Sequence, residues 1–213
     1  MILYGGKLSP FVMRPLLVSR AKGAEVTLGN FEGGIKCPDY LALCPTGKMP
    51  LLVDGDLALP ESQVIADYLD MALPGPKLVP TDAAGAAKVR LLVRLADSYV
   101  VPQLGGLFRG RENPAGVPDA LKGMAEALGY IEHYRNAADE FAHGDSFTQA
   151  DAALIPLFFF FDALDGKMPT KALVTANPGL AAWWARAKAS PLGAQAIAEQ
   201  AEGLKQMMAS RAS

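Results

Sequence analysis

The sequence predicts a small α/β unit followed by an all-helical unit. Strand-like and helix-like segments alternate over residues 1–75, and Asp54-Gly55 there separates two apolar runs. That dipeptide between apolar runs is typical of a β-hairpin. A proline-rich segment, residues 74–80, is followed only by apolar residues at helical spacing. We therefore predict one domain over residues 1–75 and a second, all-helical domain over residues 81–213.

The first domain is expected to follow the order β-α-β-α-β-β-α. "MILYG" is a short apolar strand, and "FVMRPLLVSRAKG" has helical spacing and ends at Gly23, a residue type that suits a helix end. "EVTLGNF" is the second strand and "CPDYLALCP" a short helix. "MPLLVDGDLALP" is the hairpin, and "ESQVIADYLDMAL" is an amphipathic helix. The first strand–helix–strand unit implies a parallel pair with a right-handed crossover.

The second domain is expected to consist of helices separated by loops that contain proline or glycine. Thr148 and Asp151 have the spacing of a capping box, to which we assign a folding role. The run Phe158–Phe161 points around a helix, so most of these rings must belong to the core. The predicted helical segments are residues 82–109, 118–142, 148–164, 179–189 and 192–208.

Composition excludes several classes of function. The chain has 213 residues and a formal net charge of −2, and its basic residues are scattered, which argues against a nucleic-acid partner. The most apolar run, "AALIPLFFFFDALDG", is too short to cross a bilayer, and the N-terminus lacks the pattern of a signal peptide. We therefore expect a soluble cytoplasmic protein with no membrane partner.

The cysteines and histidines do not indicate a metal site. Cys37 and Cys44 are seven residues apart and form no C-x-x-C pair, and His133 and His143 lack ligand-like spacing. We expect no metal and interpret both cysteines as ordinary thiols.

The stretch "LSPFVMRPLL" places a serine directly before a predicted helix. Pro10 suits the first helical position, and Ser9 suits the N-cap, where a hydroxyl accepts a bond from a backbone N–H one turn into the helix. A helix N-terminus also favours an anion, so Ser9 has a second possible role at a ligand site. Pro15 falls inside the same helix, where it is expected to remove a backbone hydrogen bond and kink the helix.

Four motifs give a more specific indication. They are "SPFVMR" after the first strand, "GKMP" before the third, "LPESQVIADYL" at the start of the third helix and "GDSFTQADAALIP" in the helical part. In this order and spacing they resemble the cytosolic glutathione transferase superfamily, over nearly the whole chain. The resemblance implies a thioredoxin-like N-terminal domain, an all-helical C-terminal domain and glutathione as co-substrate.

The resemblance also implies roles for individual residues. Ser9 is expected to donate a hydrogen bond to the glutathione sulfur and so favour the thiolate, which attacks an apolar electrophile. Met49, before a cis Pro50, is expected to pair its main chain with the peptide-like ligand. Ser62 and Glu61 are expected to hold the carboxylate and the ammonium of the γ-glutamyl group. Further glutathione contacts are implied for Phe11, Lys36 and Lys48.

Some superfamily classes use an N-terminal tyrosine instead, which makes Tyr4 an alternative partner of the thiol. Tyr4 lies in a predicted strand, however, where an aromatic ring is usually core. The thiol-transfer classes carry cysteine at the position of Ser9, which argues against a mixed-disulfide reductase.

The acceptor pocket is expected between the domains, with apolar walls at Tyr99, Leu107 and Phe108. Pro102 is expected to kink the helix that carries them, and Gly105-Gly106 to open space beside it. By resemblance we also expect a homodimer, in which Asp97 reaches the partner's glutathione site.

Two alternatives to conjugation remain open at the level of sequence. One is glutathione-dependent isomerisation, or reductive cleavage of an ether or halide, on the same scaffold. The other is a non-catalytic binding protein with the same fold, since fold does not determine function.

Overall fold

The computed structural model describes residues 1–210, without the side chain of Arg111. Contacts divide the chain into two compact units, Met1–Leu78 with Pro191–Ser213, and Val79–Ser190. The last helix, α10 (Pro191–Ser210), therefore packs with the sheet-bearing unit. The compact units and the predicted domains thus differ at the C-terminal end of the chain.

The first unit follows the predicted order β-α-β-α-β-β-α. Its sheet has the strand order β2-β1-β3-β4, with β1 parallel to β2 and the other neighbours antiparallel. The elements are β1 (Ile2–Tyr4), α1 (Pro10–Ala21), β2 (Thr27–Gly29), α2 (Pro38–Leu43), β3 (Leu51–Asp54), β4 (Leu57–Pro60) and α3 (Ser62–Ala72).

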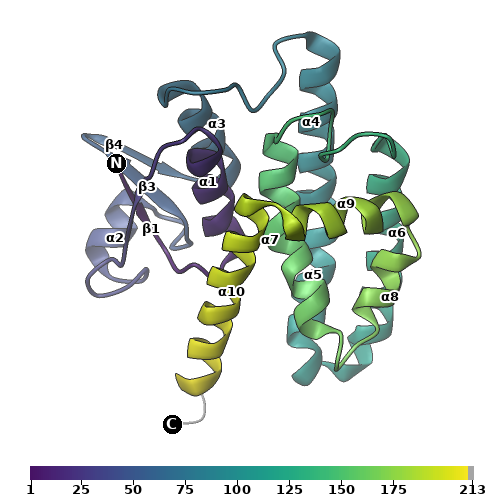
Figure 1. The fold of residues 1–213 in the computed structure, drawn as a ribbon. Helices are drawn as coiled ribbons and strands as arrows, with labels where there is room; N and C mark the ends of the chain where they lie inside the picture. The colour runs from purple at the N-terminus through teal and green to yellow at the C-terminus, as the bar shows by residue number, and fades with distance from the viewer. Residues whose placement is uncertain (211–213) are drawn as a thin grey trace. The chain divides into compact units, whose positions relative to one another are not determined.

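Helices cover both faces of this sheet: α2 lies against one face, and α1 and α3 lie against the other (Figure 1). Leu51 packs with Tyr40 and Cys44 on the α2 side. Leu52, the next residue, therefore points to the other face, because side chains alternate along a strand. Tyr4 is partly buried and packs at the edge of the α2-side cluster, with its ring 5.0 Å from that of Phe31.

Helix α1 runs from Pro10 to Ala21 without interruption at Pro15. Pro15 is buried and provides no N–H to the carbonyl of Phe11, four residues earlier. The burial of every residue from Val12 to Ser19 offsets this lost bond, because packing rather than propensity supplies most helix stability in proteins.

The second unit is helical, as predicted. Its longer elements are α4 (Ala83–Leu95), α5 (Val101–Phe108), α6 (Val117–Tyr134), α7 (Gln149–Leu164) and α9 (Pro178–Ala189). Shorter elements are the π-helix η1 (Ala96–Val100) and the 3₁₀ turns η2 (Arg109–Arg111) and η3 (Pro114–Gly116). A further short helix, α8 (Thr170–Thr175), was not predicted from the sequence.

The predicted end of one helix, at Ala142, is wrong, because α6 ends at Tyr134. The next residue, Arg135, is buried, and its guanidinium donates hydrogen bonds to the carbonyls of Gly179, Asp139 and Phe141. These bonds hold the chain after Tyr134 in a non-helical path.

The expected disturbance at Pro102 takes the form of the π-helix η1. The Val101 N–H donates to the carbonyl of Ala96, which closes a wider turn than that of an α-helix. In a regular helix the Pro102 ring would clash with the carbonyl of Ser98, and the wider turn relieves this clash. Of the pair Gly105-Gly106, which was expected to open space, Gly106 does not, since a Cβ there would lie 3.0 Å from the Ala120 Cβ and α6 fills that side. A Cβ on Gly105 would make only an ordinary contact, 3.5 Å from an Arg109 guanidinium nitrogen.

The capping box at the start of α7 is confirmed. Asp151 accepts hydrogen bonds from the Thr148 N–H and hydroxyl, both at 2.9 Å. It also accepts bonds from the Ala142 N–H and the Trp183 indole, and burial raises the pKa of this carboxyl above its ordinary value. Phe158–Phe161 are all buried, as expected for core residues.

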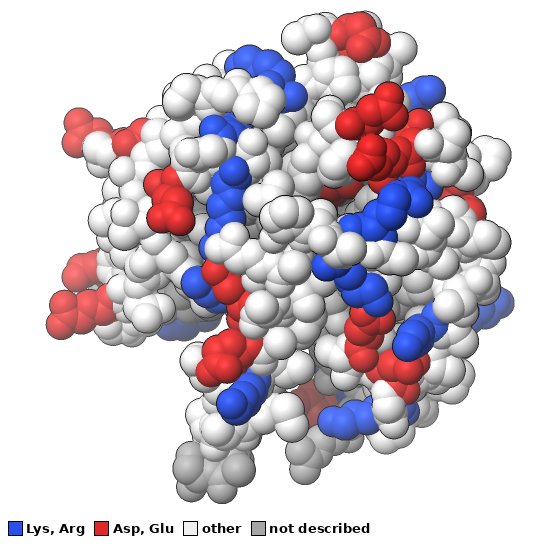
Figure 2. Space-filling model, in the orientation of Figure 1, with Lys and Arg blue, Asp and Glu red and all other residues white. Residues whose placement is uncertain are grey.

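Among residues 1–210, no helix is long and apolar enough to cross a membrane. On the face drawn in Figure 2, Lys and Arg side chains are interspersed with Asp and Glu side chains rather than gathered in one basic stripe.

A buried ion pair holds the proline-rich segment after α3 onto the first unit. The Lys22 ammonium lies 3.0 Å from an Asp70 carboxylate oxygen and also donates to the Pro76 carbonyl. Both oxygens of the Asp70 carboxylate also accept the Leu78 N–H, at 3.1 and 3.2 Å. The pair therefore joins the end of α1 to α3 and to the main chain that leads out of the unit.

We expect Lys22→Met to lower the free energy of unfolding by about 3–5 kcal/mol, because it leaves a buried carboxylate without its charged partner. Urea unfolding followed by circular dichroism measures this loss. The exposed Lys88, in α4, supplies the control Lys88→Met. The double variant Lys22→Met/Asp70→Asn should recover part of the loss. A loss no larger than that of the control would contradict the assignment.

Candidate functional site

The sheet register brings three predicted site segments to one end of the sheet. Tyr4, the last residue of β1, pairs with Leu51, the first residue of β3, and Leu51 pairs with Pro60, the last residue of β4. The chain therefore leaves β1 toward Ser9, enters β3 from Met49, and leaves β4 toward Glu61 and Ser62 at the same end. The end of β2, which leads toward Lys36, is there too, because Gly29 pairs with Tyr4.

Gly5 allows two of these segments to approach each other closely. A Cβ on Gly5 would lie 2.5 Å from Val12 Cγ2 and 3.3 Å from Met49 Cβ, and its φ is +149°. A side chain there would meet both the first turn of α1 and the segment before β3. The glycine thus permits the contact that places α1 beside Met49.

Ser9 occupies the N-cap position of α1, but its hydroxyl makes no capping hydrogen bond. Its main chain is fixed instead: the Ser9 N–H donates to Gly6, and its carbonyl accepts from the N–H groups of Val12 and Met13. Half-buried Ser9 thus presents a hydroxyl without a hydrogen-bond partner among the described residues. The expected capping bond, in which the Ser9 hydroxyl accepts a backbone N–H, is therefore not formed.

The Met49–Pro50 peptide bond is cis, as the resemblance implies. Met49 lies just outside β3, and its main chain takes no part in the loop and turn hydrogen bonds of the described residues. Behind it, the Lys48 carbonyl accepts the Tyr40 hydroxyl at 2.6 Å and the Cys44 thiol at 3.5 Å. Burial, together with the Cys44 thiol, raises the pKa of Tyr40 to about 12, so this hydroxyl remains a donor at neutral pH.

The two predicted lysines differ in their surroundings. The Lys36 ammonium donates to the Gly47 carbonyl at 2.8 Å, although its residue is exposed overall. Its amine therefore lies close to the segment that precedes Met49. Lys48 is exposed, and its carbonyl is held by the Tyr40 hydroxyl. Phe11, in the first turn of α1, is half-buried.

Glu61 has an unusual backbone conformation. Among the described residues other than glycine it alone has a positive φ, 69°, with ψ 112°. Such a conformation costs about 1–3 kcal/mol and is often found at functional sites. Glu61 is exposed, whereas Ser62, the first residue of α3, is buried. The sequence carries no signal for this conformation, because glycine is the usual residue at a positive φ.

A buried arginine behind the site was also missed from the sequence. Arg14 is 2% exposed, and one of its guanidinium nitrogens lies 3.4 Å from the Gln63 side-chain oxygen. This bond joins α1, which Ser9 precedes, to the first turn of α3, which begins at Ser62. An arginine on the apolar stripe of a predicted helix was the available sequence signal.

Comparisons with known proteins identify the family of the chain. Family models match at residues 3–77, as the N-terminal domain of glutathione S-transferase, and at residues 114–186, as its C-terminal domain. Glutathione S-transferase 3 of Zea mays is 34% identical over 212 residues, which cover 92% of each chain. The chain belongs to the glutathione S-transferase family. The thioredoxin-like fold of the N-terminal part and the helical C-terminal part are thereby confirmed, and the chain is a glutathione-dependent transferase.

One solved structure and one further relative are also similar to this chain. A solved structure of glutathione S-transferase III in its apo form is 32% identical, with a TM-score of 0.75, over 92% of this chain and 95% of that one. A stringent starvation protein A homolog from Coxiella burnetii is 27% identical over 81% of each chain.

In this transferase the predicted acceptor residues lie in the second unit, around α5. Tyr99, in η1, is 47% exposed and makes an edge contact with the Tyr130 ring at 5.3 Å. Phe108 is 50% exposed and contacts the Phe160 ring at 5.0 Å, whereas Leu107 is buried. Asp97 is half-buried in η1. Two of the three predicted wall residues thus expose aromatic surface.

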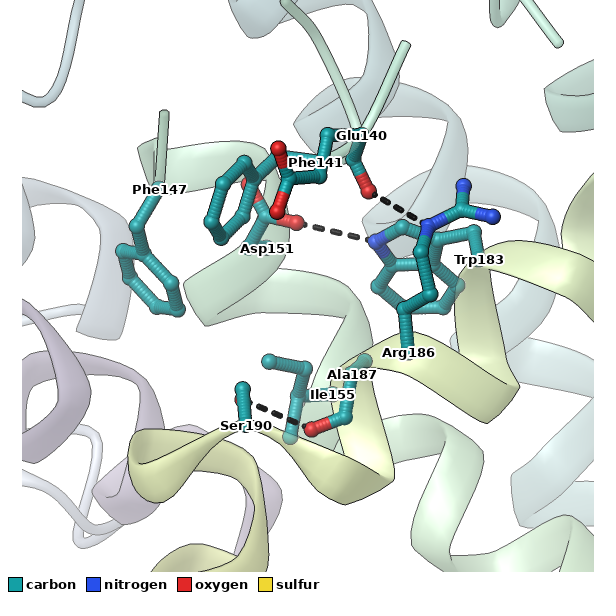
Figure 3. A pocket seen from close by; sticks show the side chains of 9 residues that line it. All are labelled: Glu140, Phe141, Phe147, Asp151, Ile155, Trp183, Arg186, Ala187 and Ser190. Atoms are coloured by element: carbon teal, nitrogen blue, oxygen red, sulfur yellow. Dashed lines mark hydrogen bonds between the residues drawn. The ribbon is translucent and has the colours of Figure 1, made fainter. Parts of the chain in front are cut away.

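The second unit also contains a cavity of about 50 Å³ at the start of α7, shown in Figure 3. Two of its polar side chains already have partners: Asp151 bonds with the Trp183 indole, and Arg186 with the Glu140 carbonyl. A pocket for a small-molecule substrate usually measures about 300–1,000 Å³. The cavity is therefore part of the capping structure of α7, and we do not assign the acceptor to it. Its lining comprises Glu140, Phe141, Phe147, Asp151, Ile155, Trp183, Arg186, Ala187 and Ser190.

The contact at Gly5 leads to a prediction with an adjacent control. Gly5→Ala should lower the free energy of unfolding by about 1–3 kcal/mol or more, because the added methyl overlaps Val12 and the backbone is unfavourable for alanine. At Gly6 an added Cβ meets nothing within 4 Å, so Gly6→Ala should change stability little. Thermal unfolding of the two variants tests this. Equal stability of the two variants would show that the close approach at Gly5 has been misassigned.

Proposed function

We propose that this transferase stabilises the glutathione thiolate through the Ser9 hydroxyl and adds it to an apolar electrophile. The observation that carries the proposal is the state of Ser9. Its hydroxyl lies at the start of α1, makes no capping bond, and is located at the same end of the sheet as Met49 and Ser62. An unused donor at a helix N-terminus suits an anionic ligand atom.

We assign the remaining contacts with the tripeptide to the other predicted segments. The main chain of Met49 is available to pair with the cysteinyl residue of glutathione as an added strand. Ser62 and the first N–H groups of α3 suit the γ-glutamyl carboxylate, and the Glu61 carboxylate suits its ammonium. At the other end, Lys36 and Lys48 suit the glycine carboxylate, and Phe11 lies in the first turn beside Ser9.

The proposed reaction requires no covalent enzyme intermediate. The thiol proton leaves to solvent, and the Ser9 O–H then donates to the sulfur while the N-terminus of α1 stabilises its negative charge. The thiolate electron pair forms a C–S bond to the electrophilic carbon, and the leaving group departs with the electrons of the broken bond. Ser9 keeps its proton throughout, so no further co-reactant is needed.

We further propose that the exposed rings of Tyr99 and Phe108 provide apolar surface for the electrophile, with Leu107 buried on the same helix as Phe108. The functional unit that we propose is a homodimer, in which Asp97 lies toward the glutathione site of the partner subunit.

Substitution of Ser9 tests the central step. Ser9→Ala should raise the pKa of the bound glutathione thiol by about one to two units, because a hydrogen bond to a charged group contributes about 1.5–3 kcal/mol. The same loss lowers kcat/KM about 10- to 150-fold. Thiolate absorbance during a pH titration measures the pKa, and conjugation of an activated aryl halide measures the rate. Ser9→Thr, which keeps the hydroxyl, is the matched control.

The same titration, combined with analysis of the reaction products, separates the alternatives. A wild-type complex with a lowered thiol pKa but no conjugate, and with product formed without consumption of glutathione, would indicate an isomerase. Oxidised glutathione among the products would indicate reductive cleavage. A wild type that binds glutathione in calorimetry with an unshifted thiol would leave a binding protein, and the proposed function would then be wrong.

Glu61 allows binding and stability to be separated. Glu61→Ala and Glu61→Gly both remove the carboxylate, so both should weaken glutathione binding. Glycine adopts a positive φ without steric cost, whereas alanine does not, so the glycine variant should be more stable than the alanine variant by about 1–3 kcal/mol. Calorimetry with glutathione and urea unfolding give the two quantities. Equal stability of both variants would argue against strain at Glu61, and unchanged affinity would argue against its role in binding.

A further inference from the structure

The C-terminal helix contacts the main chain directly before Ser9. Helix α10 lies beside α1 within the first unit (Figure 1). The Gln200 side-chain amide donates to the Leu8 carbonyl at 3.4 Å, across 192 positions of sequence. Gly203 lies against the same residue: a Cβ there would be 3.0 Å from the Leu8 Cβ and 3.1 Å from the Leu8 nitrogen. The helix thus packs on the main chain of the residue that precedes Ser9.

One carboxylate of α10, that of Glu199, contacts basic residues at both ends of α1. Glu199 accepts hydrogen bonds from an Arg20 guanidinium nitrogen to both of its oxygens, each at 2.9 Å, and lies 3.1 Å from the Lys7 ammonium. Lys7 is in the loop before α1, and Arg20 is in its last turn. Burial by itself would raise the pKa of Glu199, but the bonds from Arg20 and Lys7 outweigh it and hold the pKa below its ordinary value.

The contacting residues share one side of α10. Glu199 and Gly203 are four positions apart, so they lie one above the other on the helix, and Gln200 is adjacent and fully buried. Glu202 and Gln206 are exposed and hydrogen-bond to each other. Helix α10 therefore presents a defined face to the loop Gly6–Ser9.

The loop needs such support for the proposed chemistry. Ser9 makes no side-chain bond that would fix its own position, so its hydroxyl is placed by the main chain from Gly6 to Ser9. That main chain follows a pair of glycines, which gives it more freedom than other residues would. Hydrogen bonds hold the main chain of Ser9 itself, and the contacts from α10 restrain the two residues directly before it, Lys7 and Leu8.

We propose that Glu199, Gln200 and Gly203 are positioning residues, which hold Lys7 and Leu8 and thereby place the Ser9 hydroxyl against the glutathione sulfur. This inference rests on the proposed function of Ser9. It assigns to α10 a part in thiol activation without contact between α10 and the reacting atoms.

Two variants disturb this face in different ways. Gly203→Ala adds a methyl group against Leu8, and Glu199→Gln keeps the side-chain size but removes the charge. The matched controls are Gly129→Ala, where an added Cβ meets nothing within 4 Å in the middle of α6, and Glu202→Gln on the exposed side of α10. Each alanine variant gains similar helix propensity, so propensity does not separate the pair.

Gly203→Ala and Glu199→Gln should raise the pKa of the bound glutathione thiol and lower kcat about 10- to 100-fold, since small misplacements of a positioned group reduce rates by such factors. The affinity for glutathione should change less than about threefold, because Met49 and α3 are not disturbed. Both controls should retain the wild-type thiol pKa and kcat. Circular dichroism establishes that each variant keeps its helical content.

A double-mutant cycle makes the test specific. If α10 acts through Ser9, then Glu199→Gln should shift the thiol pKa in the wild type and not in the Ser9→Ala background. An equal shift in both backgrounds would overturn the inference. Reduced thermal stability with a wild-type thiol pKa and kcat would also overturn it, since a purely structural role gives that result. A wild type that does not lower the thiol pKa would instead overturn the proposed function, and this inference with it.

Discussion

The antiparallel pairing of Tyr4, Leu51 and Pro60 across three strands is the constraint on which the candidate site depends. Because strand register has a period of two residues, a slip of one position would turn Leu51 and Leu52 to the opposite faces of the sheet. Both residues are buried, each under a different helical layer, so such a slip would expose apolar surface on both sides. The core packing therefore determines the register, and the register places the loops of Ser9, Met49 and Glu61 at one end.

The element order and several site positions were predictable because their signals are local. The Asp54-Gly55 turn, the Thr148 capping box and the proline after Ser9 each act within a few residues, so a sequence pattern shows them directly. The cis bond at Pro50 is different, since most bonds before proline are trans and only the family resemblance indicated it. The predicted end of α6 was wrong by eight residues, Ala142 instead of Tyr134, because the buried Arg135 bonds to the carbonyl of distant Gly179 as well as to nearby carbonyls.

The parts of the site that sequence reasoning missed are set by contacts between distant segments. The bond from Arg14 to Gln63 and the pairing of Glu199 with Arg20 join residues that are 49 and 179 positions apart. Periodicity shows which face of a helix is apolar, and does not show which other helix covers that face. For the same reason the last helix was assigned to the helical domain by sequence, whereas its contacts lie with α1.

The start of α1 illustrates how stability and chemistry are divided among residues. A serine at the N-cap usually contributes about 0.5–2 kcal/mol through its hydroxyl, and Ser9 does not make that bond. Pro10 reduces the need for it, because proline has no N–H to satisfy in the first turn. The buried face of α1 from Val12 onward and the Glu199 bond to Arg20 stabilise the helix by other means. The hydroxyl of Ser9 is thus not required to hold the helix together, and this leaves it available to a ligand.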